Sequence, residues 1–172
     1  MKVNQDVVRR AIGGDREAFV SLYGSVYKAL YAFAYYTLQN AHDAEDVVSE
    51  TVLAAFEQIS RLKNEEAFGA WIFKILANRC KRRLKQYTEK TERLNDSIIF
   101  TDSEEWDNDV KSMMGVLSKE ERMIVSLTVI AGYTSGEIGR ILHRNSSTVR
   151  SKYSRALKKM QKELEKQGGG IL

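Results

Sequence analysis

The sequence predicts an all-α protein with an N-terminal four-helix bundle (residues 1–87), an acidic linker (88–112) and a C-terminal helix-turn-helix domain (113–172). Apolar residues recur every three or four positions, and the 172 residues include no proline, which suits long helices. Charge changes along the chain: 13 basic residues accompany 10 acidic ones in the first segment, 3 accompany 8 in the second and 11 accompany 5 in the third. This pattern indicates two anion-binding modules around an extended linker, although solvated helix faces would also produce it.

Composition limits the cellular context. The longest apolar run, residues 29–36, is about half of what a bilayer crossing needs. The N-terminus lacks the basic-then-apolar pattern of a signal peptide. A single cysteine, Cys80, excludes an internal disulfide framework. We therefore expect a cytoplasmic protein with no direct membrane insertion.

The N-terminal helices are defined by their start and stop signals. A first helix ends at Gly13 and Gly14, Asp15 can cap the second, Asp43 opens the third, and the fourth spans about residues 66–87. Four helices with short connections predict a bundle. The predicted buried stripe of the fourth helix comprises Phe68, Ile72, Ile75, Leu76, Cys80 and Leu84.

The linker and the C-terminal helices follow. Periodicity fades after residue 88, where Ile98, Ile99 and Phe100 form one apolar cluster among acids. Two capping boxes, residues 118–121 and 134–137, then start two helices. Ser146 or Ser147 can cap a last helix from Thr148 to about Lys166, with an inner face of Val149, Tyr153, Ala156, Leu157, Met160 and Leu164.

A short capped helix, a turn and a longer basic helix predict a DNA-binding helix-turn-helix. Arginine can hold a guanine edge with two hydrogen bonds, whereas lysine suits phosphate contacts that give affinity without sequence choice. Helical pairs that never touch DNA share this pattern, and that alternative stays open. The predicted outer face of the last helix comprises Arg150, Ser151, Lys152, Ser154, Arg155, Lys158, Lys159 and Lys162.

The N-terminal bundle carries two faces of opposite charge. On the fourth helix, cations flanked by Arg79 and Arg83 predict contact with a nucleic-acid backbone, unless the face is merely solvated. Trp71 could stack on a base, but its apolar neighbours favour the core. The third helix carries an acidic face, only part of which the helix dipole explains, so a protein partner is expected. The basic stripe comprises Lys74, Asn78, Lys81, Arg82 and Lys85, and the acidic face comprises Asp43, Asp46, Glu50 and Glu57.

Three blocks of sequence resemble extracytoplasmic-function (ECF) sigma factors of the sigma-70 family. They are DAEDVVSE at 43–50, AFGAWIFKILAN at 67–78, and GYTSGEIGRIL followed by STVRSKYSRA at 132–156. Their order and spacing match the family over about residues 5–87 and 110–165. The resemblance implies an alternative sigma factor that directs bacterial core RNA polymerase to promoters. Such a factor recognises minus-35 duplex and melted minus-10 DNA.

The resemblance also implies partners and residue roles. The acidic helix would dock on the β′ clamp through Asp43, Asp46 and Glu50, and the C-terminal module would also meet the β flap. The linker would run toward the RNA exit channel, and an anti-sigma factor is a further expected partner. Flipping a base costs a few kcal/mol, which the minus-10 contacts must offset. Minus-10 contacts would come from Leu62, Lys63, Asn64, Lys74, Asn78, Lys81 and Arg82, and minus-35 contacts from Arg150, Ser151, Ser154 and Arg155.

Three positions depart from the family pattern. Ser49 stands where glutamine is frequent, which puts part of the clamp contact in doubt. His143 stands where the helix-turn-helix turn usually has glycine, and Asn64 replaces a common loop glycine. Histidine and asparagine are both enriched at positive φ, so we expect the fold to survive.

Two other functions are compatible with parts of the sequence. A helix-turn-helix regulator, with an N-terminal bundle that senses a ligand or dimerises, would explain residues 118–166 but not the basic stripe. A nuclease would need converging ligands, whereas His42 and His143 are far apart and the acids lie along one exposed helix face. Cys80 falls on an apolar stripe. We therefore expect no catalytic residue, no metal and no cofactor.

Overall fold

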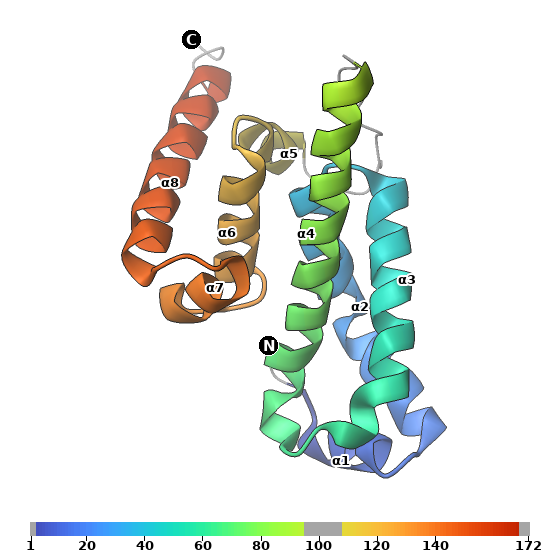
Figure 1. Ribbon diagram of the computed structural model, residues 1–172. Helices are drawn as coiled ribbons and strands as arrows, with labels where there is room; N and C mark the ends of the chain where they lie inside the picture. The colour runs from blue at the N-terminus through green and yellow to red at the C-terminus, as the bar shows by residue number, and fades with distance from the viewer. Residues whose placement is uncertain (1–2, 95–107, 169–172) are drawn as a thin grey trace.

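The computed structural model describes residues 3–94 and 108–168, and these residues form helices and no strand (Figure 1). This confirms the predicted all-α fold. The N-terminal module contains α1 (Gln5–Ile12), α2 (Arg16–Leu38), α3 (Ala41–Gln58), the short 3-10 helices η1 (Ile59–Arg61) and η2 (Glu65–Ala67), and α4 (Phe68–Leu94). The C-terminal module contains α5 (Asn108–Gly115), α6 (Lys119–Val129), α7 (Ser135–Leu142) and α8 (Ser146–Gly168).

Side-chain caps position the N-terminal helices. Asp15 caps α2 as predicted, accepting a hydrogen bond from the Ala18 amide at 3.0 Å. The third helix starts two residues earlier than predicted, because Asn40 is its cap and accepts from the Asp43 amide at 2.9 Å. Gln39 ends α2 in the left-handed conformation with φ 55°. This tight connection places α2 and α3 side by side (Figure 1).

The helix predicted to end near residue 87 continues to Leu94. No glycine or proline stops it, and Lys85 faces Glu89 one turn later at 3.8 Å. The start of the predicted linker, residues 88–94, therefore belongs to α4, and its end, from residue 108, belongs to α5. The apolar cluster at 98–100 lies outside the described residues.

The C-terminal module forms around its two capping boxes. Ser118 and Glu121 cap α6 reciprocally, and Thr134 and Glu137 do the same for α7, both as predicted. The preceding helix α5 was not expected from the sequence. It forms where Met114 is buried against residues of α6 and α8, a contact that no local periodicity signals.

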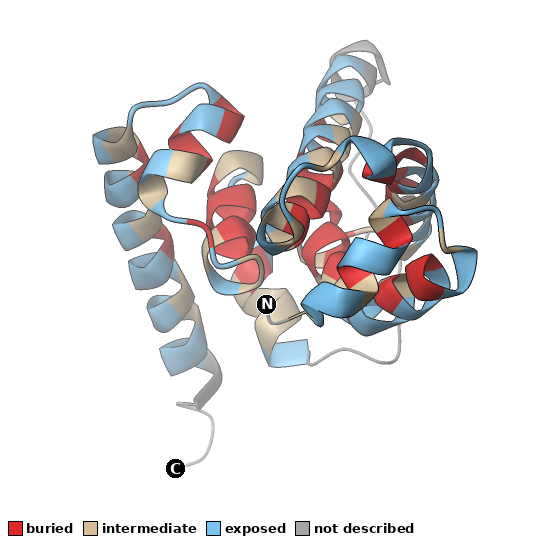
Figure 2. Ribbon diagram, turned by 90° about the horizontal axis from the view of Figure 1, so that it is seen from below, coloured by how far each residue is buried: buried red, intermediate tan, exposed pale blue. Residues whose placement is uncertain are grey.

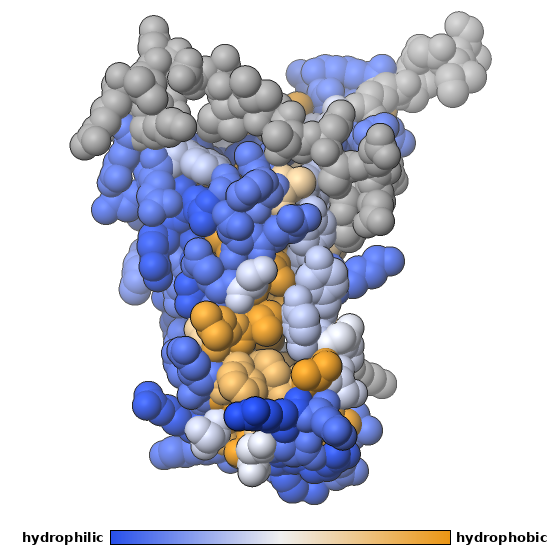
Figure 3. Space-filling view, turned by 90° about the vertical axis from the view of Figure 1, so that its right-hand side faces the viewer, coloured by the Kyte–Doolittle hydropathy of each residue, from blue (hydrophilic) through white to orange (hydrophobic). Residues whose placement is uncertain are grey.

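Apolar side chains also reach the outer surface, on the α2–α3 side of the N-terminal module. In Figure 3 hydrophobic side chains gather in the lower half of one face, surrounded by hydrophilic ones. The largest exposed apolar residues of these two helices are Val20 (68% exposed), Tyr27, Leu53 (62%) and Phe56 (45%). Phe56 packs edge-to-face on Phe19 with ring centroids 5.1 Å apart.

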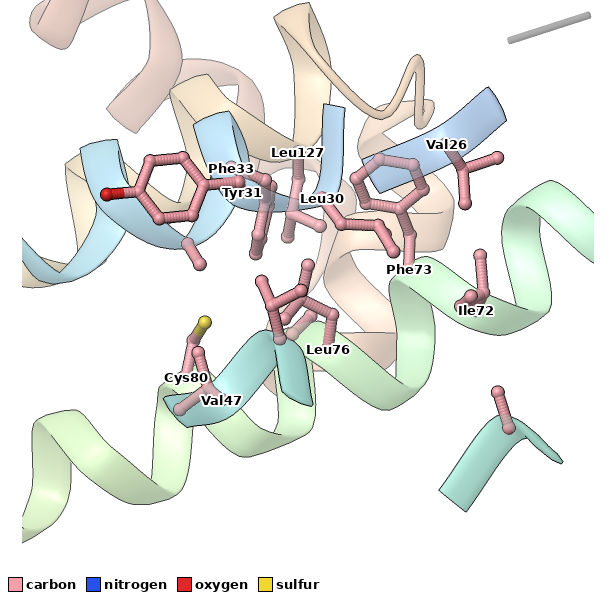
Figure 4. Packing of buried hydrophobic residues seen from close by; sticks show 14 of the residues in the cluster. Val26, Leu30, Tyr31, Phe33, Val47, Ile72, Phe73, Leu76, Cys80 and Leu127 are labelled. Carbon is pink, nitrogen blue, oxygen red and sulfur yellow. The ribbon is translucent and has the colours of Figure 1, made fainter. Parts of the chain in front are cut away.

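The two modules share one hydrophobic core. Buried positions of both modules face one another in Figure 2, and Figure 4 shows Leu127 of α6 beside Leu30 and Phe33 of α2. Phe73 of α4 completes this contact, with its ring 5.7 Å from that of Phe33. The helices of the C-terminal module thus pack directly on α2 and α4.

Polar groups cross the same interface, with incomplete pairing. The buried Arg122 guanidinium donates to the Thr37 carbonyl at 3.3 Å, and the Tyr133 hydroxyl donates to the Ala70 carbonyl. Burial lowers the pKa of Arg122 and raises the pKa of Tyr133 to about 12. Among the described residues, Thr37 Oγ1, Gln39 Oε1 and Ser126 Oγ are buried at these helices without a hydrogen-bond partner. Such atoms weaken a packed interface.

None of the described helices combines the length and apolar character that a membrane span requires.

Candidate nucleic-acid and protein interfaces

The turn between α7 and α8 is held by its backbone. His143 adopts φ 55°, as its place in the turn suggested, and the Arg144 amide donates to the Gly139 carbonyl at 2.8 Å. A Cβ atom added to Gly139 would lie 2.4 Å from the Arg144 carbonyl oxygen. Only glycine therefore lets the turn approach α7 this closely.

Helix α8 presents the four predicted minus-35 residues together. The cap of this helix is Asn145 rather than Ser146 or Ser147, because the Asn145 carboxamide accepts from the Thr148 hydroxyl at 2.6 Å and from its amide at 3.4 Å. The helix begins at the next residue, Ser146, and one side of its first turns is exposed to solvent. The exposed residues there are Arg150, Ser151, Ser154 and Arg155.

Two lysines predicted on the outer face of α8 point toward α6 instead. Lys152 pairs with Glu120, and the Lys159 ammonium lies 2.8 Å from a Glu121 carboxylate oxygen. The sequence pattern of α8 alone could not reveal these partners, which come from another helix. The cations of α8 without an acidic partner on α6 are therefore fewer, among the described residues, than the predicted outer face contained.

The outer edge of α8 also differs from the predicted stripe. Leu157 and Leu164, expected on the inner face, are 43% and 48% exposed. The neighbouring helices contact only the side of α8 that contains Val149 and Ala156, so the buried stripe is narrower than the periodicity suggested.

The basic stripe of α4 is exposed along its whole length, as predicted. Its five residues lie on the side of the helix opposite Ile72, Leu76 and Cys80, which are buried in the core. Burial raises the pKa of the Cys80 thiol, which fits a packed rather than a reactive cysteine. Trp71 is partly buried against the core, 6.0 Å from Phe68 between ring centroids, which agrees with the favoured core interpretation.

The loop before α4 lies at one end of this stripe. Leu62 is partly buried, Lys63 is exposed, and Asn64 caps η2 through the Glu66 amide at 2.9 Å. The Asn64 backbone is extended at φ −138°, so this position does not use the left-handed conformation. Helix α1 holds the loop in place, because Arg9 pairs with Glu65 at 2.8 Å.

The loop and Asn78 occupy different positions along the basic stripe. Asn78 follows the first residue of α4 by ten positions, which corresponds to about 15 Å along the helix axis. The resemblance assigns the loop and Asn78 together to one flipped base, and this assignment stays a prediction.

Arg79 and Arg83 do not join the basic stripe. The Arg79 guanidinium lies 2.6 Å from Glu50, whereas Arg83 pairs with Asp43 and lies 3.8 Å from Asp46. Both arginine side chains are only 21% exposed. They form a seam of ion pairs between α3 and α4 that separates the acidic face from the basic stripe.

The acids predicted to contact a protein are brought together along this seam. Asp43 is the most enclosed, with a side chain 17% exposed that accepts hydrogen bonds from Arg83 and Tyr87. Burial, followed by the Asp43 carboxylate, raises the pKa of the Tyr87 hydroxyl. Asp46 and Glu50 remain 46% and 48% exposed. These two carboxylates are thus more accessible to a partner than Asp43.

The same helix carries apolar residues that sequence reasoning missed. Leu53 and Phe56 follow Glu50 by one and two turns and are exposed. Exposed apolar groups beside charged ones are typical of protein interfaces. The available signal was their position off the buried stripe that contains Thr51, Ala55 and Ile59.

Ligand atoms of His42, Asp43 and Asp46 lie within 4.8 Å of one another. Arg83 pairs with both carboxylates, so its positive charge already occupies the position that a cation would take. This geometry offers no support for a metal centre at the start of α3.

Comparisons with known proteins match both modules. The model of sigma-70 region 2 matches residues 22–89, and that of sigma-70 region 4 matches residues 107–160. The chain is 26% identical over 157 residues to the ECF RNA polymerase sigma factor SigM of Mycobacterium tuberculosis, covering 89% of this chain and 80% of the relative. It is 23% identical over 176 residues to the ECF RNA polymerase sigma factor SigW of Bacillus subtilis, covering 91% and 94%.

Two solved structures share the fold. CnrH, in complex with the cytosolic domain of CnrY, superimposes with a TM-score of 0.66 at 24% identity, covering 94% of this chain and 96% of the other. The sigma factor RpoE of Bartonella quintana, in complex with the anti-sigma factor NepR, gives a TM-score of 0.69 at 22% identity, covering 86% and 96%.

Proposed function

Because the chain belongs to the extracytoplasmic-function group of the sigma-70 family, we propose that three of its surfaces divide the work of promoter recognition. It is an alternative sigma factor, a protein that directs core RNA polymerase to promoters. The family predicted from the sequence is thereby confirmed. Sigma factors are transcription-initiation factors that bind DNA, and we propose that this chain acts in the cytoplasm with no catalytic centre of its own.

The observation that carries this proposal is the separation of charge within the N-terminal module. The ion-pair seam lies between the exposed carboxylates on the α3 side and the exposed basic stripe on α4. Asp46, Glu50 and the adjacent Leu53 would dock on the β′ clamp of polymerase. The stripe on the other side of the seam would hold minus-10 DNA.

Within the basic stripe, Asn78 would supply base selection. Cations bind every phosphate equally, so charge alone cannot select a base. A carboxamide offers both a donor and an acceptor to an unpaired base edge. Its hydrogen bonds would help to offset the few kcal/mol that extrusion of a base from the duplex costs.

Helix α8 would read the minus-35 duplex. Its first turns carry Arg150 and Ser151 in the position where a recognition helix meets base edges in the major groove. Ser154 and Arg155 lie one turn later and would extend the contact. The same module would meet the β flap of polymerase.

Promoter recognition would require the two modules to separate. The two elements lie about 25 base pairs apart, or roughly 85 Å of duplex, whereas a compact chain of this size measures roughly 40 Å across. The incompletely paired polar atoms between α2 and α6 favour such an opening, because water would satisfy them. An anti-sigma factor, as in the RpoE complex, would act on this equilibrium.

Run-off transcription with purified core polymerase and a library of promoter fragments tests the proposal. We expect transcripts from a subset of fragments only when the chain is added, and base changes in either element should reduce them. An ordinary helix-turn-helix regulator would bind its operator alone. Failure of the chain to associate with core polymerase at near-physiological ionic strength would overturn the proposal.

A further inference from the structure

Two adjacent glutamates at the start of α6 hold three positions of the helix-turn-helix. Glu120 accepts from Arg144 in the turn at 2.9 Å and from Lys152 in α8. Glu121 accepts from Lys159 at 2.8 and 2.9 Å. These contacts connect α6, the turn and two points of α8, and we call them the glutamate clamp.

The two lysines help to set the rotation of α8 about its own axis. Lys152 and Lys159 are seven residues apart, so they lie almost on one line along the helix, two turns from each other. The buried Val149 and Ala156 hold α8 on its neighbours, and two ion pairs on one line add resistance to rotation about the helix axis. The exposed Arg150 and Ser154 lie on the opposite side of the helix, so their direction depends on this rotation.

The clamp is more enclosed than an ordinary surface ion pair. The Glu120 and Glu121 side chains are 28% and 10% exposed. Burial raises the pKa of Glu120, but hydrogen bonds from Lys152 and Arg144 outweigh it, so the pKa lies below its ordinary value. Both carboxylates are therefore charged at neutral pH.

The glutamate clamp also pairs a cation that could otherwise contact DNA. Arg144 lies in the turn beside the proposed recognition surface, and it would add a phosphate contact if Glu120 released it. Lys152 lies on the other side of α8 and would not. Glu120 therefore limits non-specific affinity while it keeps α8 in one orientation. Loss of a residue that merely stabilises the fold would not lower minus-35 discrimination and raise non-specific DNA affinity at the same time.

We propose that Glu120 and Glu121 are positioning residues for minus-35 recognition, which orient α8 and restrain neighbouring cations without touching DNA themselves. This inference rests on the proposed role of α8 as the minus-35 reader. The resemblance to sigma factors assigns them no role, and the proposal comes from the contacts between α6, the turn and α8.

The test compares Glu120→Gln with the unaltered chain. Holoenzyme reconstituted with core polymerase is assayed for binding to a promoter selected by run-off transcription and to minus-35 variants of it. We expect Glu120→Gln to reduce discrimination among these variants by about threefold to fivefold, the effect of a partly exposed ion-pair network. Non-specific duplex binding by the free full-length chain should instead become more salt-dependent, the slope steepening by about one because each phosphate contact contributes about 0.9.

Two further variants show whether these changes come from loss of the clamp contacts or from loss of a negative charge alone. Lys152→Gln should lose discrimination in the same way without steepening the salt dependence, because Arg144 stays paired with Glu120. Glu165→Gln removes the same charge from α8, where Glu165 bonds only to Gln161 among the described residues, and should change neither property. Thermal unfolding of each variant measures any general loss of stability.

The possible results support or overturn the inference. Unchanged discrimination by Glu120→Gln, or equal weakening of specific and non-specific binding, would overturn it while leaving the proposed function intact. If the unaltered holoenzyme showed no dependence on minus-35 sequence, both the role of α8 and the clamp would be rejected.

Discussion

The two modules use the same ion-pair chemistry for different ends. In the N-terminal module, Arg79 and Arg83 pair with three acids, and two of these, Asp46 and Glu50, are nearly half exposed. In the C-terminal module, the acids are enclosed, and Glu121 is only 10% exposed. Carboxylates thus form part of the proposed docking surface in the first module and part of the internal framework in the second.

This difference shows how a charged helix can serve two partners. Each module turns some cations of its DNA-facing helix toward acids of a neighbouring helix. The remaining cations are then confined to one side, where the proposed DNA contacts lie. In the N-terminal module, the ion pairs of Arg79 and Arg83 also lie between the basic stripe on α4 and the acidic face on α3. The two surfaces therefore stay separate.

The largest loss of stability and promoter binding should follow from a substitution in the turn between α7 and α8. Gly139→Ala would place a methyl group 2.4 Å from the Arg144 carbonyl oxygen, so the turn must move. We expect a loss of about 3 kcal/mol in the free energy of unfolding, at the upper end of overpacking effects, together with loss of minus-35 binding. Chemical denaturation measures the first and promoter binding the second.

Gly136→Ala is the matched control, because a Cβ at that position meets nothing within 4 Å. This variant should be neutral or slightly stabilising, since alanine favours helices over glycine by about 1 kcal/mol. Equal effects of the two substitutions would show that the close approach of the turn to α7 is unimportant.

The next effect concerns duplex reading by α8. Arg150→Ala should cost about 1–3 kcal/mol in promoter binding and relax specificity at one minus-35 position. Competition binding of holoenzyme to single-base promoter variants measures this. Lys158→Ala, further along α8, should instead weaken binding to all sequences alike, and an identical specificity profile for both variants would contradict a base contact by Arg150.

A smaller and more selective effect is expected in the N-terminal module. Asn78→Ala should weaken open-complex formation by about 1 kcal/mol, roughly fivefold, because one or two neutral hydrogen bonds to an unpaired base are lost. Core-polymerase binding should be unaffected. Permanganate reactivity of melted DNA and a core-binding assay measure the two steps, and equal losses in both would reject the role of Asn78.

The smallest expected effect is a pH dependence of the stability of α8, which arises from the carboxylates of Glu120 and Glu121. Hydrogen bonds and ion pairs hold the pKa values of Glu120 and Glu121 below their ordinary value despite burial. Their contribution to stability is therefore present above the unfolded pKa of about 4.5 and is lost as the pH falls through the lower folded pKa. Hydrogen exchange, corrected for its intrinsic pH dependence, should show α8 losing protection as the pH falls below about 4.5. The Glu120→Gln variant should show a smaller change, and identical profiles for both chains would contradict the prediction.

The sequence predicted features that depend on local chemistry. The Asp15 cap, both capping boxes, the positive φ of His143 and the exposed basic stripe were all confirmed by the structure. Each depends on residues within a few positions of one another or on the period of a single helix. Local rules were therefore sufficient for most of the secondary structure.

Features that depend on a distant partner were missed. The inward direction of Lys152 depends on Glu120, 32 positions earlier, and that of Arg83 on Asp43, 40 positions earlier. Helix α5 forms because Met114 meets residues of α6 and α8. The contact of α6 with α2 was equally hidden, because Leu127 and Leu30 each belong to an ordinary amphipathic helix.

The packing of α6 on α2 has a thermodynamic consequence for the free protein. If promoter contact needs the modules apart, the measured dissociation constant equals the intrinsic one divided by the fraction of molecules already open. A chain that is open one time in about a hundred would bind promoters about a hundredfold more weakly than its contacts allow. Core polymerase, by accepting only the open form, would restore that affinity without adding a single contact to DNA.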